Sequence, residues 1–274
     1  MEAEAQASGL LAELVRNAKR RAALARPLRH DLERAAAAAS PPPDFGAALA
    51  APGGVAVIAE IKRRSPSAGA IREAGEVGGL AGSLAAAGAS ALSVLTEETH
   101  FGGSLDDLSR VASAVSVPVL RKDFILDPIQ LFEARARGAS AVLLIVRILG
   151  AGPLAELLAL ARDLGLSALV EVHGETELAT ALEAGATIVG VNARDLDSLA
   201  VDPPLVARLL PAVPGRCVAV AESGLASRAD VERVAARGAD AVLMGTAISG
   251  AADPASALRG VLAVPRQPRS GVRS

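Results

Sequence analysis

The sequence has one cysteine, no tryptophan, no tyrosine and only four phenylalanines. Because a disulfide needs two cysteines, Cys217 excludes an internal disulfide and fits a reducing compartment. Basic residues are not in excess, since 28 Lys and Arg stand against 30 Asp and Glu, a net charge of −2. Charge therefore gives no indication of a nucleic-acid partner or of an anionic membrane surface. The scarcity of aromatic residues leads to no functional inference.

Long apolar runs and targeting signals are also missing. No uncharged apolar run reaches the roughly 18 residues that suggest a membrane span. The stretch MEAEAQASGLLAELVRNAKRR lacks a basic segment followed by an apolar core, so no secretion signal is expected. We therefore expect a cytoplasmic protein without a membrane partner. Of the 274 residues 51% are apolar, enough for a substantial core in one large domain or two modest ones.

One phrase recurs along the chain: the end of an amphipathic helix, a glycine, a small residue and a short β-rich run. Its copies are AAAGASALSVLT (85–96), ARARGASAVLLIV (134–146), LEAGATIVGVN (182–192) and AARGADAVLMGT (235–246). Glycine at that point ends a helix in a left-handed conformation and turns the chain into a strand. Further strand-like runs are VAVIAEIK (55–62), VPVLRKD (117–123), SALVEV (167–172) and CVAVAES (217–223). Eight strands alternating with helices are therefore expected.

Strands that alternate with helices imply parallel β-structure. Eight such units in this length predict an α/β protein with a (β/α)8 TIM barrel over residues 51–264. An open, doubly wound sheet is the alternative, but no G-x-G-x-x-G follows the first strand. Helical spacing of apolar residues predicts an N-terminal helical extension over 1–50, and PRQPRSGVRS (265–274) is expected to be a disordered tail.

Charged residues lie near the carboxyl ends of the strand-like runs, where a barrel of this kind carries its active site. They are Glu60, Lys62, Lys122, Glu171 and Glu222, with Asn192 ending the sixth run and Arg194 following it. The first five belong to odd-numbered strands, and interior layers of such a barrel draw side chains from alternate strands. We expect Glu60, Lys122, Glu171 and Glu222 to form the top interior layer, with Lys62 just above it.

Each of these charges, taken alone, is equally well explained as a structural ion pair or a solvated strand end. Five of them from alternating strands favour an acid–base site at the barrel mouth instead. The last two strands end in ESG (222–224) and MGT (244–246). Loops after the last two strands commonly bind phosphate, and small residues let backbone N–H groups approach it. Ser223, Gly224, Gly245 and Thr246 therefore suggest a sugar-phosphate substrate, although ordinary turn chemistry also uses such residues.

Six motifs together resemble the indole-3-glycerol phosphate synthase family of tryptophan biosynthesis. They are AEIKRRSPS (59–67), SVLTEETHFGGS (93–104), PVLRKDF (118–124), ALVEVH (168–173), VGVNARDL (189–196) and AESGL (221–225). The resemblance spans nearly the whole barrel. It implies a lyase that closes, decarboxylates and dehydrates 1-(o-carboxyphenylamino)-1-deoxyribulose 5-phosphate to indole-3-glycerol phosphate. It also implies that no metal and no organic cofactor is needed. The sequence leaves open whether the chain is a monomer or a homodimer.

The resemblance also implies roles for individual residues. Lys122 resembles the general acid that protonates the ketone oxygen, and Glu171 the acid–base partner in the dehydration. Lys62 would contact the substrate carboxylate or phosphate. The substrate would be oriented by Glu60, Asn192, Arg194 and Glu222. Its aromatic ring would bind in an apolar slot of Phe101, Phe124 and Leu120. Its phosphate would be contacted by Ser65, Ser223, Gly224, Gly245 and Thr246. Residues 63–69 would form a mobile flap, whereas His173 is expected to face a helix or solvent without a chemical role.

The chain departs from the family pattern at three positions, with Ala68 for a lysine, Ala193 for an asparagine and Ile129 for a tyrosine. Neither Ala68 nor Ala193 removes a proton-transfer group. Phosphoribosylanthranilate isomerase is the nearest enzymatic alternative, but it uses a cysteine base where this chain has Lys62. The α subunit of tryptophan synthase is a weaker rival because its paired acids lack these lysines. A non-catalytic phosphate-binding barrel would not require Lys122 and Glu171.

Overall fold

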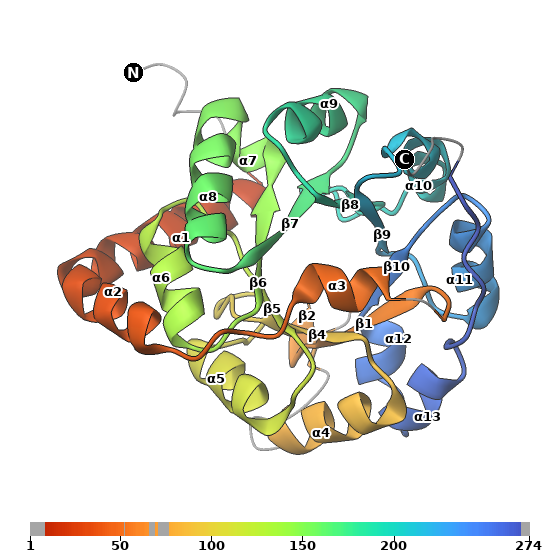
Figure 1. Ribbon diagram of the computed structural model, residues 1–274, viewed down its shortest axis with the longest axis horizontal. Helices are drawn as coiled ribbons and strands as arrows, with labels where there is room; N and C mark the ends of the chain where they lie inside the picture. The colour runs from red at the N-terminus through yellow and green to blue at the C-terminus, as the bar shows by residue number, and fades with distance from the viewer. Residues whose placement is uncertain (1–8, 52, 66–68, 71–76, 270–274) are drawn as a thin grey trace.

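The computed structural model describes residues 9–51, 53–65, 69–70 and 77–269 (Figure 1). Eight parallel strands close into a barrel in the order β1-β10-β9-β8-β7-β6-β5-β4. The strands are β1 (Ala56–Ile61), β4 (Ala91–Leu95), β5 (Val119–Lys122), β6 (Ala141–Ile145), β7 (Ser167–Val172), β8 (Ile188–Asn192), β9 (Val218–Glu222) and β10 (Ala241–Met244). Each lies within one of the eight predicted runs, so the (β/α)8 prediction is confirmed.

Helices connect successive strands around the outside of the barrel (Figure 1). They are α4 (Val77–Ala87), α5 (Leu105–Ala114), α6 (Ile129–Ala136), α7 (Val146–Leu149), α8 (Ala151–Asp163), α9 (Glu175–Glu183), α10 (Pro203–Leu209) with the 3-10 turn Leu210–Ala212, α11 (Arg228–Ala235), α12 (Thr246–Ser249) and α13 (Pro254–Arg259). Their starts follow ordinary capping chemistry. Ser104 caps α5, and Ser227 forms a capping box with Asp230 at α11.

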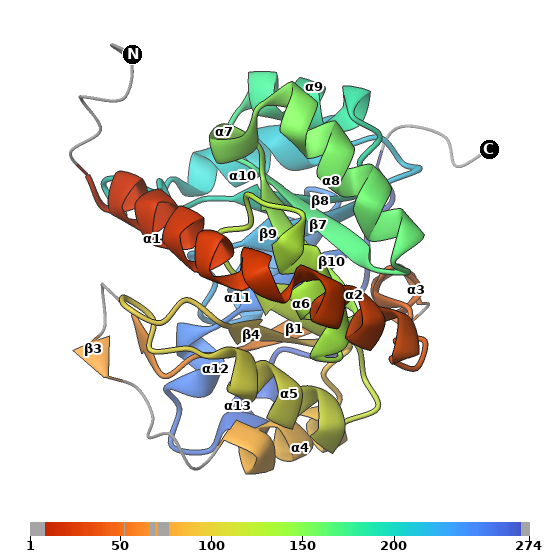
Figure 2. The ribbon, with the colours of Figure 1, turned by 90° about the vertical axis from the view of Figure 1, so that its left-hand side faces the viewer.

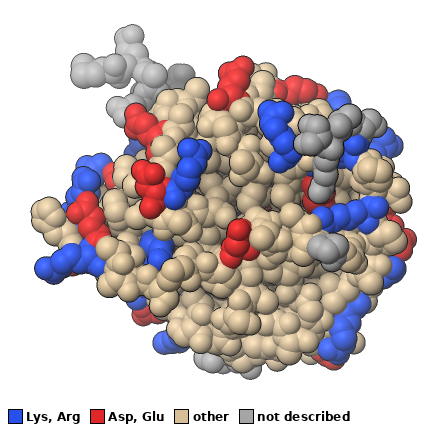
Figure 3. Space-filling model, viewed as in Figure 1, with Lys and Arg blue, Asp and Glu red and all other residues tan. Residues whose placement is uncertain are grey.

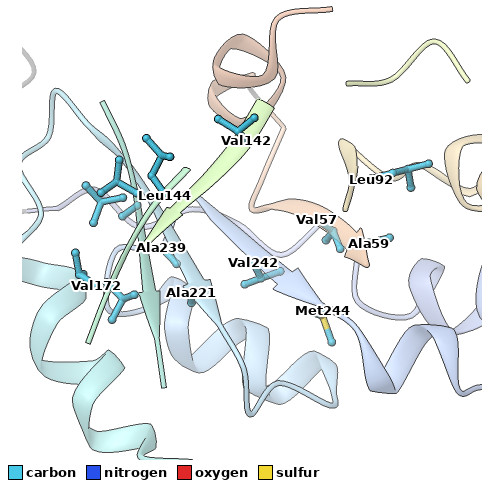
Figure 4. Close-up of a cluster of buried hydrophobic side chains, with 14 of the residues drawn as sticks. Val57, Ala59, Leu92, Val142, Leu144, Val172, Ala221, Ala239, Val242 and Met244 are labelled. Carbon is cyan, nitrogen blue, oxygen red and sulfur yellow. The ribbon is translucent and has the colours of Figure 1, made fainter. Parts of the chain in front are cut away.

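The barrel has two apolar layers because successive side chains of a strand point to opposite faces. Val57 and Ala59 of β1 belong to the outer layer between strands and helices, part of which is drawn in Figure 4. Ala56 and Ile58 of the same strand belong to the inner layer that fills the barrel. Glu60, next on the inner face, is therefore directed into the mouth.

The N-terminal extension forms three helices, α1 (Leu10–Ala25), α2 (Arg29–Ala38) and α3 (Phe45–Ala50), with the 3-10 turn Arg26–Leu28 between the first two. Figure 2 shows α1 starting at the end of the barrel where β3 lies and running toward the opposite end, where α3 lies. Helix α2 packs on α6. The extension therefore reaches both ends of the barrel.

Helix α3 closes the amino-terminal end of the barrel. Its residues Phe45 and Leu49 are fully buried and belong to the inner apolar layer. Four strands begin with alanine in the same layer: Ala56, Ala91, Ala141 and Ala241. Because these side chains are small, they leave room for the large side chains of α3 between the strand starts.

Parts of the expected flap (63–69) and of the expected disordered tail (265–274) have defined structure. In the loop after β1, the short strands β2 (Arg64–Ser65) and β3 (Gly69–Ala70) pair antiparallel, while residues 66–68, including Ala68, lie outside the described residues. Residues 265–269 of the expected disordered tail lie against the barrel. Arg266 donates to the backbone oxygen of Gly54 at 2.7 Å, and Arg269 pairs with Asp240 at 2.7 Å.

The surface shows no strong separation of charge on the face drawn in Figure 3. Acidic and basic side chains are interspersed there and lie mostly toward the edges, as the small net charge predicts. Within the described part of the chain, none of the helices combines the length and the apolar character that crossing a bilayer requires.

We predict that Phe45→Ala lowers the free energy of unfolding by about 3–5 kcal/mol, because it empties the closed end of the inner core. Urea unfolding followed by circular dichroism measures this change. The control is Leu24→Ala on α1, whose side chain is 71% exposed and whose replacement should shift stability by no more than about 0.5 kcal/mol. Equal losses in the two variants would contradict the role of Phe45.

Candidate active site

Charged side chains line the inside of the barrel mouth. Lys122, Glu171 and Glu222 lie two residues beyond Leu120, Leu169 and Val220, which belong to the inner layer. Since side chains alternate along a strand, all three charged groups are directed inward. The predicted interior position of these groups is confirmed by the contacts between them. We call Glu60, Lys62, Lys122, Glu171 and Glu222 the ionic cluster.

Lys122 is the centre of the ionic cluster. Its Nζ lies 3.1 Å from Oε2 of Glu171 and 3.2 Å from Oε2 of Glu222. The three residues come from β5, β7 and β9, which are alternate strands of the barrel. Both carboxylates are 1% exposed, so each would be strongly destabilised without a cationic partner.

The pKa values of the cluster are shifted in different directions. Burial alone would lower the pKa of Lys122, but the charges of Glu171, Glu222 and Glu60 outweigh it and raise the pKa. Burial raises the pKa of Glu171, yet Lys122 and His173 reverse this and hold it well below its usual range. Burial, opposed by Lys122 but supported by the neighbouring carboxylates, raises the pKa of Glu222 to about 7. Lys122 therefore keeps its proton at neutral pH, and Glu171 is ionised.

Two glycines provide the space that the ionic cluster occupies. A Cβ at Gly190 of β8 would collide with Oε1 of Glu222 and lie 3.2 Å from its Cδ. A Cβ at Gly245, directly after β10, would collide with Oε1 of Glu60 and come within 2.9 Å of Nζ of Lys62. Only glycine fits at either position without displacing an ionic group.

The upper part of the cluster is formed by Lys62 and by the end of β8. Nζ of Lys62 lies 3.0 Å from Oε1 of Glu60. Oδ1 of Asn192 accepts the backbone N–H of Arg194 at 2.9 Å, and the Arg194 guanidinium donates to the oxygen of Leu199 at 2.8 Å. These bonds hold the loop after β8 over the mouth.

Two adjoining cavities meet at the cluster. The first, of about 120 Å³, is walled mainly by apolar side chains, and the second, of about 530 Å³, by the loops after β9 and β10. Both are lined by Glu60, Lys62, Lys122, Arg194 and Ser223. The site therefore has an apolar end, an ionic centre and a small-residue end.

Phe101 and Phe124 line the apolar cavity, as expected. The backbone N–H of Phe101 donates to Oε2 of buried Glu97 at 3.1 Å, which fixes the loop that carries the ring. Leu120 does not line either cavity and needs correction as a substrate contact. It lies on the inward face of β5 two residues before Lys122, one layer deeper, and is fully buried.

The small-residue cavity is lined by four predicted phosphate-binding residues, Ser223, Gly224, Gly245 and Thr246. Ser223 and Gly224 both adopt positive φ, 65° and 71°, so the backbone turns sharply after β9. A serine in this conformation is uncommon and strained, a feature often found where a ligand is held. The Ser65 side chain lies outside the described part of the structure.

Several residues of the site have no counterpart among the predictions. Leu10 and Leu14 of α1 line the apolar cavity; their helical spacing predicts a buried face but not where it packs. Arg21 of α1 forms two hydrogen bonds with Asp123, at 2.6 and 2.9 Å, directly beside Lys122. Gly190 could have been recognised, since a glycine inside a strand often marks a close approach.

Comparison with known proteins identifies the family. The family model described as indole-3-glycerol phosphate synthase matches residues 11–261. A protein of that name from Mycolicibacterium smegmatis is 50% identical over 228 residues, covering 83% of this chain and 84% of the relative. Those from Mycobacterium avium and Mycobacterium tuberculosis are 49% identical with the same coverage.

Solved structures of lower identity share the barrel. The 3-hexulose-6-phosphate synthase from Salmonella typhimurium is 18% identical with a TM-score of 0.62, covering 76% of this chain and 96% of that chain. Thiamine phosphate pyrophosphorylase from Pyrococcus furiosus is 17% identical with a TM-score of 0.56, covering 76% and 93%. At this identity the likeness concerns the fold alone. The family model and the relatives of about half identity show more: the chain belongs to the indole-3-glycerol phosphate synthase family.

Proposed function

We propose that the chain converts 1-(o-carboxyphenylamino)-1-deoxyribulose 5-phosphate to indole-3-glycerol phosphate, carbon dioxide and water, as a carboxy-lyase of tryptophan biosynthesis. The observation that carries this proposal is the position of Lys122, between two carboxylates and at the junction of two cavities. The substrate has an aromatic ring at one end, a phosphate at the other and a ketone between them. The order of features along the substrate matches the order of features along the site.

Lys122 is the proposed general acid of ring closure. As the ring carbon that bears the carboxylate attacks the ketone, the carbon–oxygen double bond opens and negative charge develops on oxygen. An ammonium in a buried site stabilises that charge and transfers a proton to it. The carboxylates around Lys122 keep it protonated before the reaction, and the developing alkoxide is basic enough to take the proton.

Glu171 is the proposed acid–base group of the later dehydration. After carbon dioxide leaves and the aromatic ring is restored, the new hydroxyl leaves as water while a proton is lost from the neighbouring carbon. Both changes concern atoms close to the former ketone, which Lys122 would hold. Glu171 lies 3.1 Å from Lys122, so one bound molecule can reach both groups. Its ionised state suits removal of a proton.

The remaining residues orient the substrate in this proposal. Lys62 would pair with the substrate carboxylate or phosphate, and Arg194 lines both cavities at the point where the substrate chain crosses between them. Phe101 and Phe124 would hold the aromatic ring. The turn at Ser223 and Gly224 would present backbone N–H groups to the phosphate. Glu60 would hold Lys62 and Glu222 would hold Lys122 in place, and Asn192 would orient the substrate.

We predict that Lys122→Ala lowers kcat by roughly 10²–10⁴-fold, the usual contribution of a positioned general acid. The chain has no Trp and no Tyr, so indole fluorescence that appears on incubation with substrate reports product alone. Affinity for an analogue whose ketone is reduced to an alcohol should change much less, because the apolar and phosphate contacts remain. Isothermal titration measures it. An unchanged rate would refute the assignment of Lys122.

Glu171→Gln should lower kcat by at least about tenfold while altering KM little, because the amide keeps the shape of the side chain but cannot take up a proton. Steady-state kinetics with the fluorescence assay separate the two parameters. A change confined to KM would argue against a role of Glu171 in the chemical steps.

Gly190→Ala should lower kcat through displacement of Glu222 from Lys122, because the added methyl group collides with Oε1 of Glu222. Gly174→Ala is a matched control: this glycine has extended backbone, φ −179°, and an added Cβ meets no atom within 4 Å. The control should retain the natural rate and melting temperature. Equal rates in both variants would show that the space beside Glu222 has no catalytic importance.

A further inference from the structure

His173 lies between two carboxylates beside the ionic cluster. It directly follows β7, and its side chain is 2% exposed. Its Nε2 lies 3.4 Å from Oε1 of Glu171, and its Nδ1 lies 3.2 Å from Oε2 of Glu177 on helix α9. The backbone N–H of His173 donates to the same Glu177 oxygen at 2.8 Å. The ring thus faces a helix, as predicted, and also faces Glu171, which the sequence did not indicate.

The two oxygens of Glu171 have different cationic neighbours. Oε2 lies next to Lys122, which lines both cavities, whereas Oε1 lies next to His173, which lines neither. One cation is therefore on the substrate side of the carboxylate and the other is behind it. At 3.4 Å the contact with His173 is long for a hydrogen bond, so its attraction is chiefly electrostatic.

The surroundings of His173 favour its charged form. Burial alone would lower the pKa of His173, but its contacts with the Glu171 and Glu177 carboxylates and their negative charges outweigh burial and raise the pKa to about 9. Glu177 is held by Arg147, whose Nε lies 3.1 Å from its Oε1, and Arg147 also contacts Asp195 at 2.9 Å. The groups that face the ring are thus anionic, and the nearest cations lie beyond them.

We propose that His173 is a positioning residue for the reaction: its imidazolium, anchored on Glu177, holds Oε1 of Glu171 so that Oε2 stays directed at Lys122 and the substrate. The inference rests on the acid–base role proposed above for Glu171. Without His173, the carboxylate is held only from the cavity side, by Lys122 at Oε2 and by a hydrogen bond with the Asn192 side chain. The terminal torsion of a glutamate is broad, so its orientation is then less well defined. Groups that orient a functional side chain from behind commonly change activity about 10–100-fold when removed, as measured for metal ligands.

The first test compares His173→Leu with His173→Gln. The leucine removes both the donor and the charge, and kcat should fall roughly 10–100-fold with little change in KM. The glutamine keeps a donor and should recover part of the loss. His30→Leu is the control, because the His30 side chain is 94% exposed and belongs to α2 of the N-terminal extension, not to the strand ends that form the site. Melting temperatures identify any variant that fails to fold. If His173→Leu does not fold, the kcat of His173→Gln tests the proposal.

The pH profile separates positioning from packing. Loss of the His173 cation raises the pKa of Glu171, since one of two nearby positive charges disappears while Lys122, Glu222 and Glu60 remain. The ionised form of Glu171 is then lost at a higher pH, so the acidic limb of kcat should move upward in both His173 variants. A purely structural histidine would leave this limb in place. In addition, His173→Leu should add little to the loss already caused by Glu171→Gln, because the two act through one group.

A second test measures the protonation state of the His173 ring directly and does not depend on catalysis. The chain has three histidines, so nitrogen-15 labelling of histidine followed by NMR assigns His173 by comparison with its variants. Both ring nitrogens should be protonated at pH 8, and Glu171→Gln should lower the titration midpoint. A neutral ring at pH 7, or a folded His173→Leu with natural kcat and pH profile, would overturn the inference. Absence of indole product from the natural chain would instead overturn the proposed function, because the NMR signals do not depend on catalysis.

Discussion

The arrangement of the mouth depends on the ammonium of Lys122 and the carboxylates of Glu171 and Glu222 that share it. These groups lie inside a barrel, where an isolated ion would cost several kcal/mol. Opposite charges at 3.1 and 3.2 Å offset that cost and explain why the inner face can change from apolar to ionic within two residues on β5, β7 and β9. The same attraction holds the ammonium in its charged form. In the proposed mechanism, the ion pair that stabilises the buried charges also supplies the proton donor.

The N-terminal extension is part of this arrangement. Arg21 of α1 grips Asp123 with two hydrogen bonds, and Thr96 donates a third at 2.7 Å. Burial alone would raise the pKa of Asp123, but Arg121 and Arg21 lower it. The carboxylate therefore stays charged and forms a salt bridge with Arg21. Because Asp123 follows Lys122 directly, α1 is tied to the strand that presents the ammonium. At the other end of the barrel α3 fills the inner core with Phe45 and Leu49.

Much of this could be predicted from the sequence because barrel geometry is periodic. Alternation along a strand and alternation between strands together determine which side chains meet at the mouth, and Glu60, Lys122, Glu171 and Glu222 obeyed both rules. Eight strand-like runs, four of them within the recurring glycine phrase, predicted the barrel before any contact was known. Helix starts could also be predicted from local sequence, as at the N-cap formed by Ser227.

What could not be predicted depends on packing between segments distant in the chain. The periodicity of α1 indicates an apolar face, but not that Leu14 lines the site cavity. Leu120 is apolar, as a contact to an aromatic ring should be, but it is fully buried one layer below the cavities. The type of residue does not indicate how deep in the barrel its side chain lies. The sequence does not indicate a role for His173, because its contact with Glu171 is visible only when the side chain of Glu171 on β7 and that of His173 just after the strand are both placed. Arg266 and Arg269 likewise order residues 265–269 through contacts with Gly54 and Asp240.

Specificity in this chain belongs to the strand ends and to the helices that border them. A barrel of the same outline occurs in proteins of 18% and 17% identity with other names, so the fold alone selects no reaction. In this chain an apolar cavity and a small-residue cavity meet at the ammonium groups of Lys62 and Lys122. Gly190 and Gly245 are required because the carboxylates that hold the cations need the space that a methyl group would fill. The proposed substrate carries its ketone oxygen between an aromatic ring and a phosphate, in the same order as the ammonium groups and the two cavities.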